Sequence, residues 1–497
     1  MHCTIAPPEE RVAALALAPP LLFYEARRSN GGEEQAGMTN DRQSIRPFLA
    51  WLETQGALQR ITDSVDPVHE ISAFLSLADR GPALLFESVT GSPLRIAGNL
   101  LAGRERVAAA LGVPEAGIVA AIQRAIAEPV LPIAADHAAV QQVVEKEAPL
   151  AKLPVPTFFE HEQRPYITAG VILARDPHTG NGNASFARLG ILDDRTALVG
   201  IAPNHHLALF ARRAAERGET LPIAVVLGAH PAIQMAACLY LGVGDDELHC
   251  AGRLLGSPVE LIDALTVDLK VPAGAEIVLE GQLDARDPVH EGLISEYHGM
   301  YEDYGPGIRA TFSAMTRRED AIMQVIEPGY HREHIYLGAL PIAAGLLHAI
   351  RAVVPNTQDV AVTEAGAGRT DIVVQIADPR PGQARRAMHA AFAAVSMVKR
   401  VTVVDADIDP WDAVMVDWAR CNRMKLERDL LLLPLSGTDR SEPMEAGGLV
   451  TKAGFDATAK PGDRVEGVER ALPPAAVTAA ARERLTAMFA ERPRWLA

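Results

Sequence analysis

The chain has 497 residues, with 47 basic and 63 acidic side chains and a formal net charge of −16. This length favours about two to four domains. A hydrophobic fraction of 48% is enough for sizeable cores and excludes wholesale disorder. An acidic surface repels nucleic-acid phosphates, and no basic run offsets it. We therefore expect no nucleic-acid partner.

Four cysteines are scattered along the sequence, at Cys3, Cys238, Cys250 and Cys421. None forms a CxxC pair, and the spacing suits neither a zinc site nor a disulfide framework. Reduced thiols of this kind are typical of a cytoplasmic protein. We expect that location here.

Residues 1–37 differ from the rest of the chain. Val12–Tyr24 is apolar, but it is too short to span a bilayer and is interrupted by Pro19 and Pro20. The residues before it lack the basic segment of a signal peptide. We expect either a disordered extension or a translation start at Met38, and no membrane association.

Residues 38–150 alternate between helix and strand patterns, which predicts a small N-terminal α/β domain. The predicted helices are Pro47–Gln55, His69–Arg80 and Arg104–Leu111, and the predicted strands are Leu58–Ile61, Ala83–Phe86 and Leu94–Ala97.

Residues 151–325 contain many short strand-like runs between turn-forming segments. The predicted strands are Ile167–Ala174, Ala184–Leu192, Leu198–Ala202, Ile223–Leu227, Val259–Ala264, Leu269–Val271 and Ala275–Leu283, with helices at Leu207–Arg217 and Ala232–Leu241. This pattern indicates an antiparallel or barrel-like β domain with inserted helices.

Alternation returns in residues 326–470, which predicts a C-terminal α/β domain and an α/β (α+β) fold overall. The predicted strands are Gln358–Val362, Asp371–Ile376 and Arg400–Val404, and the predicted helices are Gly382–Ala394 and Trp411–Arg420. We expect irregular structure from Ser436 onward. The tail, residues 471–497, contains a last predicted helix, Pro474–Phe489.

The common phosphate-binding and hydrolase motifs are absent from the sequence. Gly180-Asn-Gly182 and Gly366-Ala-Gly368 lack the third glycine of a dinucleotide fingerprint, and neither HExxH nor GxSxG occurs. Any enzymatic chemistry must therefore come from a less common arrangement of residues.

Three charged residues are candidates for that chemistry. Glu291 and Glu296 lie five apart in a stretch that contains Gly292 and Gly299, so they can converge on one reacting centre, although a solvated acidic loop has the same spacing. Arg188 lies inside a predicted strand, where an arginine either reaches solvent from an edge or pairs with a buried anion.

Asn183, His206 and Glu247 offer an amide oxygen, an imidazole and a carboxylate. That ligand set suits Mg²⁺ or Mn²⁺ better than Zn²⁺. His205 and His206 fit a helix N-terminus with partly buried rings equally well.

Read in order, these residues resemble the UbiD family of reversible decarboxylases over roughly Arg42 to Arg464. The resemblance rests on these segments: Asn183-x4-Arg188, Asp193-x-Arg195-Thr196, His206, Glu247, Glu276-x3-Glu280-Gly281, Glu291-Gly-x3-Glu296-x-His298-Gly299, Val403–Asp409 and Thr451–Lys460.

The resemblance implies a fold and a cofactor. The central domain would be a split β-barrel-like flavin-binding domain, and the C-terminal domain would mediate oligomerisation as a homodimer or homohexamer. The cofactor would be prenylated FMN, supplied by a flavin prenyltransferase and joined covalently to the substrate during decarboxylation. Asn183, His206 and Glu247 would hold Mn²⁺ or Mg²⁺ at the flavin phosphate, with K⁺ nearby. Further cofactor contacts would come from Ser185, Phe186, Ala187, Arg188 and His205.

The resemblance also implies catalytic roles. Glu296 would protonate the carbon after CO₂ leaves, Arg188 would help to hold the acid, and Glu291 would position Arg188 and tune Glu296. Relatives usually have prolines around the two glutamates, whereas this chain has Leu293-Ile-Ser295 between them, and it has His205 where Gln is common. These departures bear on substrate preference more than on cofactor use.

The substrate expected from the resemblance is a small aromatic or heteroaromatic acid. Glu333-His334 is similar to the branch that acts on heteroaromatic acids, so furan-2,5-dicarboxylate or a pyrrole acid leads, with a hydroxybenzoate as runner-up. A second anion site could come from nearby arginines that otherwise read as solvated, namely Arg309, Arg317, Arg318 and Arg332.

Two other classes of function compete with this reading. One is a catalytically silent partner subunit, which the presence of both glutamates and Arg188 opposes. The other is a carboxylate-dyad glycosidase, which a 5% aromatic content disfavours because sugar sites need aromatic platforms.

Overall fold

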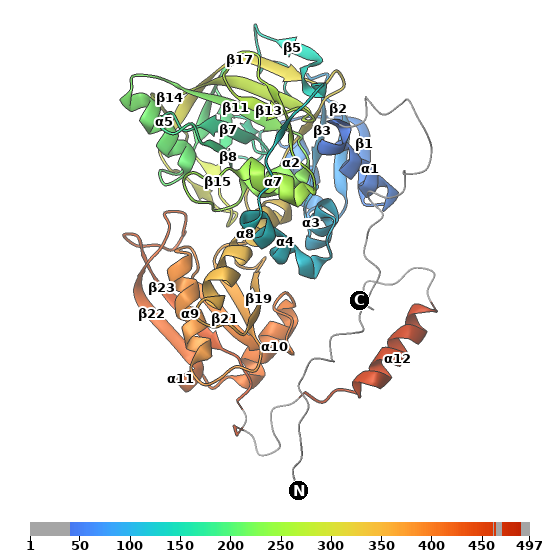
Figure 1. Ribbon diagram of the computed structural model, residues 1–497, viewed down its shortest axis with the longest axis vertical. Coiled ribbons are helices and arrows are strands. Elements are labelled where there is room, and N and C mark those ends of the chain that lie inside the picture. The colour runs from blue at the N-terminus through green and yellow to red at the C-terminus, as the bar shows by residue number, and fades with distance from the viewer. Residues whose placement is uncertain (1–39, 461, 464–469, 489–497) are drawn as a thin grey trace.

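The computed structural model describes residues 40–460, 462–463 and 470–488. A β-rich central part lies beside a smaller N-terminal α/β part, and a C-terminal α/β part lies below them, beyond helix α8 (Arg332–Arg351) (Figure 1). The mixed α/β fold expected from the sequence is confirmed. The expectations for residues 1–37, including Cys3, lie outside the described residues.

The N-terminal part is built on a four-stranded sheet in the order β1-β2-β3-β18. Its strands are β1 (Leu58–Val65), β2 (Ala83–Val89), β3 (Arg95–Gly98) and β18 (Ile322–Gln324), and its helices are α1 (Arg46–Thr54), α2 (Glu70–Leu77), α3 (Arg104–Leu111) and α4 (Ile118–Ala127). β18 follows the central strands in sequence but pairs in parallel with β3. The chain therefore returns to complete this sheet before it enters α8.

The central part contains the largest sheet, in the order β6-β9-β10-β17-β14-β11-β7-β8, with β5 pairing off β17. Its strands are β5 (Val143–Glu145), β6 (Tyr166–Ile167), β7 (Val171–Arg175), β8 (Gly182–Phe186), β9 (Arg188–Ile191), β10 (Thr196–Gly200), β11 (Leu221–Leu227), β14 (Ile277–His290) and β17 (Pro306–Arg317). Smaller strands are β4 (Ile133–Ala134), β12 (Glu260–Asp263), β13 (Lys270–Pro272), β15 (Ile294–Ser295) and β16 (Tyr301–Glu302). The helices here are α5 (His206–Glu216), α6 (Pro231–Ala237) and α7 (Glu247–Leu255).

This sheet curls into a split barrel. β8 and β9 are separated by Ala187 alone, yet β8 ends the strand order and β9 lies next to the opposite end. Two strands joined by one residue must lie close in space, so the sheet bends round until its ends meet there. Within the described chain no ladder joins the two ends, and the barrel stays open at that point.

The two glutamates of Glu276-x3-Glu280-Gly281 are structural. Glu276 is fully buried and accepts hydrogen bonds from Arg46 at 2.7 and 2.8 Å, which ties α1 to the central sheet. Glu280, also fully buried, accepts the backbone N–H of Leu265 at 3.0 Å. Paired or hydrogen-bonded carboxylates of this kind specify the packing of the parts rather than a reaction.

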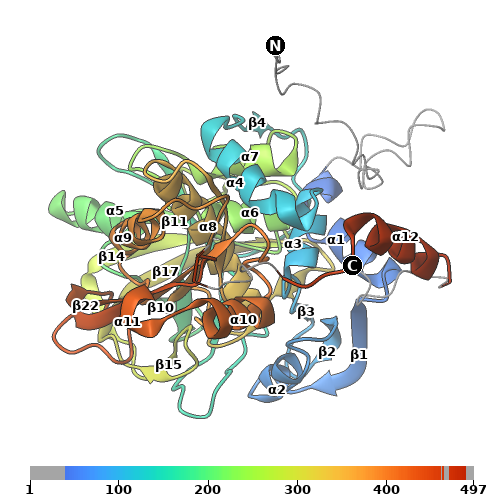
Figure 2. The same ribbon diagram turned by 90° about the horizontal axis from the view of Figure 1, so that it is seen from below.

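The C-terminal part has a five-stranded sheet in the order β19-β20-β21-β23-β22. Its elements are β19 (Thr357–Val362), β20 (Asp371–Ile376), β21 (Arg400–Asp405), β22 (Leu430–Gly437), β23 (Leu449–Asp456), α9 (Gln383–Ala394), α10 (Ala413–Arg423) and α11 (Leu426–Asp429). Helix α12 (Ala475–Thr486) lies apart from it (Figures 1 and 2). By length and composition α8 could cross a bilayer, but 78% of its apolar stretch is buried in the protein, as in a core helix.

Three sequence expectations need correction. Residues after Ser436 are not all irregular, because β23 inserts between β21 and β22. The single strand expected over Ala184–Leu192 is two strands that break at Ala187, where the chain crosses the barrel split. The helix expected over Ala232–Leu241 ends at Ala237, and α7, which begins at Glu247, was not anticipated.

Candidate active site

Arg188, Glu291 and Glu296 meet in the structure although 103 residues separate the first two. Arg188 donates from Nε and Nη2 to the two oxygens of Glu291, both at 2.7 Å. Its Nη1 lies 3.5 Å from Glu296 Oε1. A bidentate pair of this kind holds the guanidinium plane in one orientation.

The sheet register creates this meeting. Arg188 opens β9 and pairs with Gly200 of β10, β10 pairs with β17, and β17 pairs with β14, whose last residue precedes Glu291. A Cβ on Gly200 would lie 2.9 Å from Arg188 Cζ and 2.9 Å from Glu291 Oε1. An alanine at this position would therefore have to displace one of the two charged groups.

A short hairpin places Glu296. β15 and β16 pair through Ile294 and Ser295, and the Glu296 backbone N–H donates to the Met300 carbonyl at 3.1 Å. Gly299 has a φ of +79°, which favours glycine. The departure from the family's proline pattern thus coincides with a hydrogen-bonded turn.

The glutamates differ in their access to water. The Glu291 side chain is 2% exposed, whereas that of Glu296 is 17% exposed. Burial opposes the charge of Arg188, yet the hydrogen bonds and charge of Glu291, with the charge of Glu296, raise the pKa of Arg188 above its ordinary value. The cluster thus holds a fixed cation between one buried carboxylate and one that is partly exposed to solvent.

Buried Tyr166 and half-buried Tyr304 border this cluster. Burial and the charge of Glu291 raise the pKa of Tyr166, and burial and the charge of Glu296 raise the pKa of Tyr304. Within the part of the chain that the structure describes, neither hydroxyl has a hydrogen-bond partner. Sequence reasoning missed both residues, because isolated tyrosines carry no motif.

Asn183 and Glu247 form a second, buried cluster. Asn183 lies in β8, and its amide nitrogen donates to both oxygens of Glu247 at 3.1 and 3.2 Å. The backbone N–H of Ala184 donates to the same carboxylate at 2.8 Å. Burial raises the pKa of Glu247 to about 7.

His206 completes this region only in part. It begins α5, as Glu247 begins α7 behind the capping residue Asp246, and both helices pack against β8. Among the described residues, His206 forms no hydrogen bond or ion pair with Asn183 or Glu247, and no three His, Cys, Asp or Glu side chains form a metal cluster. The structure thus joins two of the three expected ligands directly.

The donor set nevertheless suits a hard divalent cation. The side-chain oxygen of Asn183 is buried, and in the described chain it has no partner, like the hydroxyl of Ser185 two residues on. Unpaired buried oxygens beside a carboxylate are what Mg²⁺ or Mn²⁺ would satisfy. The chain therefore fits a metal and a phosphate at this end of the segment 183–188.

Most of the residues expected to bind substrate already contact other parts of the protein. Glu333 is structural, because it accepts the backbone N–H groups of Leu100 and Leu101 at 3.0 Å each. His334 is half-buried, and one ring nitrogen lies 3.0 Å from the Gly329 carbonyl. The four arginines considered for a second anion site already contact carboxylates, through the pairs Arg309–Asp287, Arg317–Glu145, Arg318–Glu276 and Arg332–Glu364.

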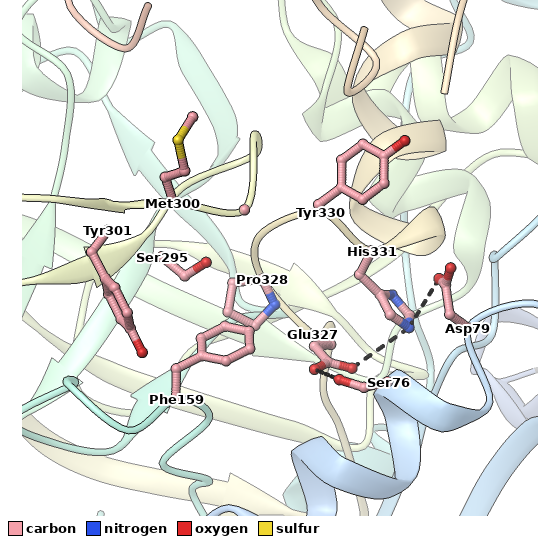
Figure 3. A pocket seen from close by; sticks show the side chains of 11 residues that line it. Ser76, Asp79, Phe159, Ser295, Met300, Tyr301, Glu327, Pro328, Tyr330 and His331 are labelled. Atoms are coloured by element: carbon pink, nitrogen blue, oxygen red, sulfur yellow. Dashed lines mark hydrogen bonds and ion pairs between the residues drawn. The ribbon is translucent and has the colours of Figure 1, made fainter. Parts of the chain in front are cut away.

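A cavity of about 290 Å³ opens beside the hairpin, between it, α2 and the segment that leads into α8 (Figure 3). On one wall His331 Nε2 lies 3.4 Å from Asp79 and 3.6 Å from Glu327. Burial raises the pKa of Glu327 to about 7. This network joins α2 of the N-terminal part to the segment that leads into α8, and Ser295 of the hairpin lines the same cavity.

Comparison with known proteins agrees with this geometry. Profiles of the 3-octaprenyl-4-hydroxybenzoate carboxy-lyase N-terminal, Rift-related and C-terminal domains match residues 49–126, 132–331 and 335–457. An anhydromevalonate phosphate decarboxylase from Methanosarcina mazei is 33% identical over 87% of this chain and 99% of its own. An uncharacterised protein from Rhodospirillum rubrum is 31% identical over 82% of this chain and 89% of its own.

Solved structures show the same fold. The UbiD-class enzyme HmfF from Pelotomaculum thermopropionicum, in complex with FMN, superposes with a TM-score of 0.84 at 36% identity, covering 87% of this chain and 97% of its own. The 3,4-dihydroxybenzoic acid decarboxylase AroY from Klebsiella pneumoniae superposes with a TM-score of 0.81 at 27% identity, covering 87% and 97%. The chain therefore belongs to the UbiD family of carboxy-lyases and is a decarboxylase of the flavin-dependent type.

Proposed function

We propose that the protein catalyses the reversible, non-oxidative decarboxylation of a heteroaromatic acid with prenylated FMN, and that furan-2,5-dicarboxylate is the leading substrate. The observation that carries the proposal is the bidentate Arg188–Glu291 pair with Glu296 at 3.5 Å. It provides one fixed cation and one carboxyl group able to move a proton.

The charges of the cluster favour an acid substrate when Glu296 is protonated. Arg188 and Glu291 then cancel, so the substrate carboxylate meets a neutral site with guanidinium donors. After CO₂ leaves, Glu296 gives its proton to the carbon and becomes a carboxylate beside Arg188. Its exposure allows solvent to return the proton, so each turnover consumes one proton and releases CO₂.

Prenylated FMN, when bound, supplies the electron sink that a departing CO₂ requires, because no side chain delocalises the charge left on an aryl carbon. Asn183, His206 and Glu247 would hold Mn²⁺ or Mg²⁺ against the flavin phosphate, with K⁺ nearby. Backbone and side chains of residues 185–188, with His205, would contact the cofactor. The unpaired oxygens of Asn183 and Ser185 support this assignment.

The substrate assignment rests on the relatives and on the resemblance of Glu333-His334 to the branch that acts on heteroaromatic acids. AroY, named for a dihydroxybenzoic acid, shares only 27% identity with this chain, against 36% for HmfF, so we keep the furan acid expected from the sequence ahead of a hydroxybenzoate. Three relatives 32–34% identical are named anhydromevalonate phosphate decarboxylases, and their name favours a phosphorylated conjugated acid as a second candidate. Both candidates carry a second anionic group.

A CO₂-release screen of the holoenzyme tests this function. The protein is coexpressed with a flavin prenyltransferase and assayed on furan-2,5-dicarboxylate, pyrrole-2-carboxylate, 3,4-dihydroxybenzoate and a phosphorylated conjugated acid. We expect the furan diacid to give the highest rate. Flavin-loaded protein that releases no CO₂ from any of them would contradict the proposal.

Assembly and location belong to the same proposal. Strand β22 forms an edge of the C-terminal sheet and exposes Leu432 and Leu435, at 56% and 79%. An apolar sheet edge supports a second copy of the chain as its partner, at least as a dimer. Among the described cysteines all three thiols are free, which supports a cytoplasmic location.

A further inference from the structure

Arg369 of the C-terminal part faces the catalytic part and has no carboxylate partner among the described residues. Arg369 lies in the turn between β19 and β20, and its side chain donates to the carbonyl of Gly368 at 2.9 Å. In the described chain it forms no ion pair, whereas Arg332 pairs with Glu364 and Arg400 with Asp371. A half-buried guanidinium without a counterion is costly unless an anion joins it.

Helix α8 is shaped to admit this guanidinium. A Cβ on Gly338 would lie 1.5 Å from Arg369 Nη1 and 2.0 Å from its Cζ. Glycine destabilises a helix interior relative to alanine, so a glycine here needs a reason. Gly345, two turns further along α8, has open space at the same position. Close approach of Arg369 accounts for the first glycine and not for the second.

The turn that carries Arg369 is held rigidly against α8. Ala367 and Gly368 have φ of +52° and +69°, in the left-handed region. A Cβ on Gly368 would lie 2.6 Å from the Ile335 carbonyl oxygen. The backbone on which the arginine stands thus contacts the helix directly, and the guanidinium is positioned before any ligand arrives.

Arg369 acts on the residues around the catalytic site. Its Cζ lies 5.8 Å from the centroid of Tyr297, the residue after Glu296. Burial lowers the pKa of His334 to about 4, and the charges of Arg369 and Arg188 both add to this effect. The charges of both guanidinium groups therefore reach His334. Glu291 neutralises that of Arg188.

We propose that Arg369 binds the distal anionic group of the substrate, a second carboxylate or a phosphate, while the carboxylate that leaves lies at Arg188. This inference rests on the proposed function and deepens it. It makes the C-terminal part a contributor to substrate specificity, since Arg369 stands on its sheet and Arg188 on the central one. Acids with two anionic groups are then preferred over the matching monoacids.

Binding calorimetry on the holoenzyme tests the role of Arg369. The probes are furan-2,5-dicarboxylate against furan-2-carboxylate, and 4-phosphooxybut-2-enoate against 4-hydroxybut-2-enoate, so that the two pairs distinguish a carboxylate from a phosphate. Arg369→Ala is expected to weaken binding of at least one dianion by roughly 10–100-fold. Its monoacid should change by less than about threefold. Arg369→Lys should recover part of the loss, and Arg386→Ala, an exposed arginine of α9, should change nothing.

A second pair of variants removes the position of the arginine without removing its charge. Gly338→Ala should displace the Arg369 guanidinium and weaken dianion binding as Arg369→Ala does, while Gly345→Ala should leave dianion binding unchanged. In the Arg369→Ala background, Gly338→Ala should weaken dianion binding no further. An equal additional loss of affinity in both backgrounds would show that the arginine is not what the glycine accommodates.

The outcomes separate this inference from the proposed function. If wild-type holoenzyme prefers a dianion through Arg369 but releases no CO₂, the function fails and the anion site stands. If it decarboxylates these acids and Arg369→Ala weakens monoacids and dianions alike, or neither, the function stands and the role of Arg369 is overturned.

Discussion

The segment from Asn183 to Arg188 ends in two clusters that differ in how far the protein completes them. At one end Arg188 has both oxygens of Glu291 and a second carboxylate in range, so its charge is matched within the chain. At the other end Asn183 and Glu247 contact each other, but the amide oxygen has no partner among the described residues. The charges around Arg188 are thus positioned in advance, whereas under the proposed function a bound cation would complete the Asn183 end.

The largest effect is expected at the completed cluster. Glu296→Gln keeps the shape of the side chain but cannot donate the required proton, so decarboxylation should fall by about 10³-fold or more. Flavin absorbance and metal content of the purified variant should match those of the wild type. Full turnover by a flavin-loaded Gln variant would remove Glu296 from its assigned role.

At the incomplete cluster, a substitution should reduce metal and flavin binding, which Glu296→Gln should leave unchanged. Asn183→Ala removes the unpaired oxygen and is expected to weaken metal binding by at least about tenfold, with loss of flavin on dialysis. Metal analysis and fluorescence titration with FMN measure both. Asn422→Ala, an exposed asparagine of α10, serves as the matched control. Unchanged metal and flavin retention would contradict the metal assignment.

Local sequence patterns predict well those elements that depend on local residues. The expected helix Arg104–Leu111 is α3, and the expected helix Gly382–Ala394 begins within one residue of α9. The three-residue strand β18 was not anticipated, because its partner β3 lies more than two hundred residues away and only the tertiary fold pairs them. The helix that begins at Glu247 could have been predicted from the sequence, because Asp246 before it is a typical N-terminal capping residue.

The candidate site shows the same division. Spacing brings Glu291 and Glu296 to one loop, but only the ladder β9–β10–β17–β14 brings Arg188 to them. From the sequence, the grouping of Arg188 with the two glutamates was expected only because of the family resemblance. The sequence pattern did not predict a role for Arg369. The glycines before it, Gly366-Ala-Gly368, resemble an incomplete dinucleotide motif, and only the fold shows that they form a turn against α8.

A smaller effect should follow from disturbing the completed cluster sterically. Gly200→Ala places a Cβ 2.9 Å from both partners of the ion pair, so one of them must shift. We expect a loss of about 1–3 kcal/mol in the free energy of unfolding, together with lower activity. Thermal melting and CO₂ release measure the two. Gly437→Ala, where the space is open, should change neither.

The last prediction concerns a buried carboxylate outside both clusters. Glu333 is fully buried, and burial raises its pKa to about 7, well above the value of about 4.3 in an unfolded chain. The folded state therefore holds a proton that the unfolded state has lost, and the stability from this group is present at low pH and is lost as pH rises from about 4.3 to about 7.

Glu333→Gln removes this titration while keeping an acceptor for the N–H groups of Leu100 and Leu101. Relative to this variant, the wild type should lose about 1–3 kcal/mol of stability between pH 5 and pH 8. Unfolding of both proteins at the two pH values measures the difference, and other buried acids cancel because both proteins contain them. Parallel pH dependence in the two proteins would show that Glu333 is already ionised in the folded state.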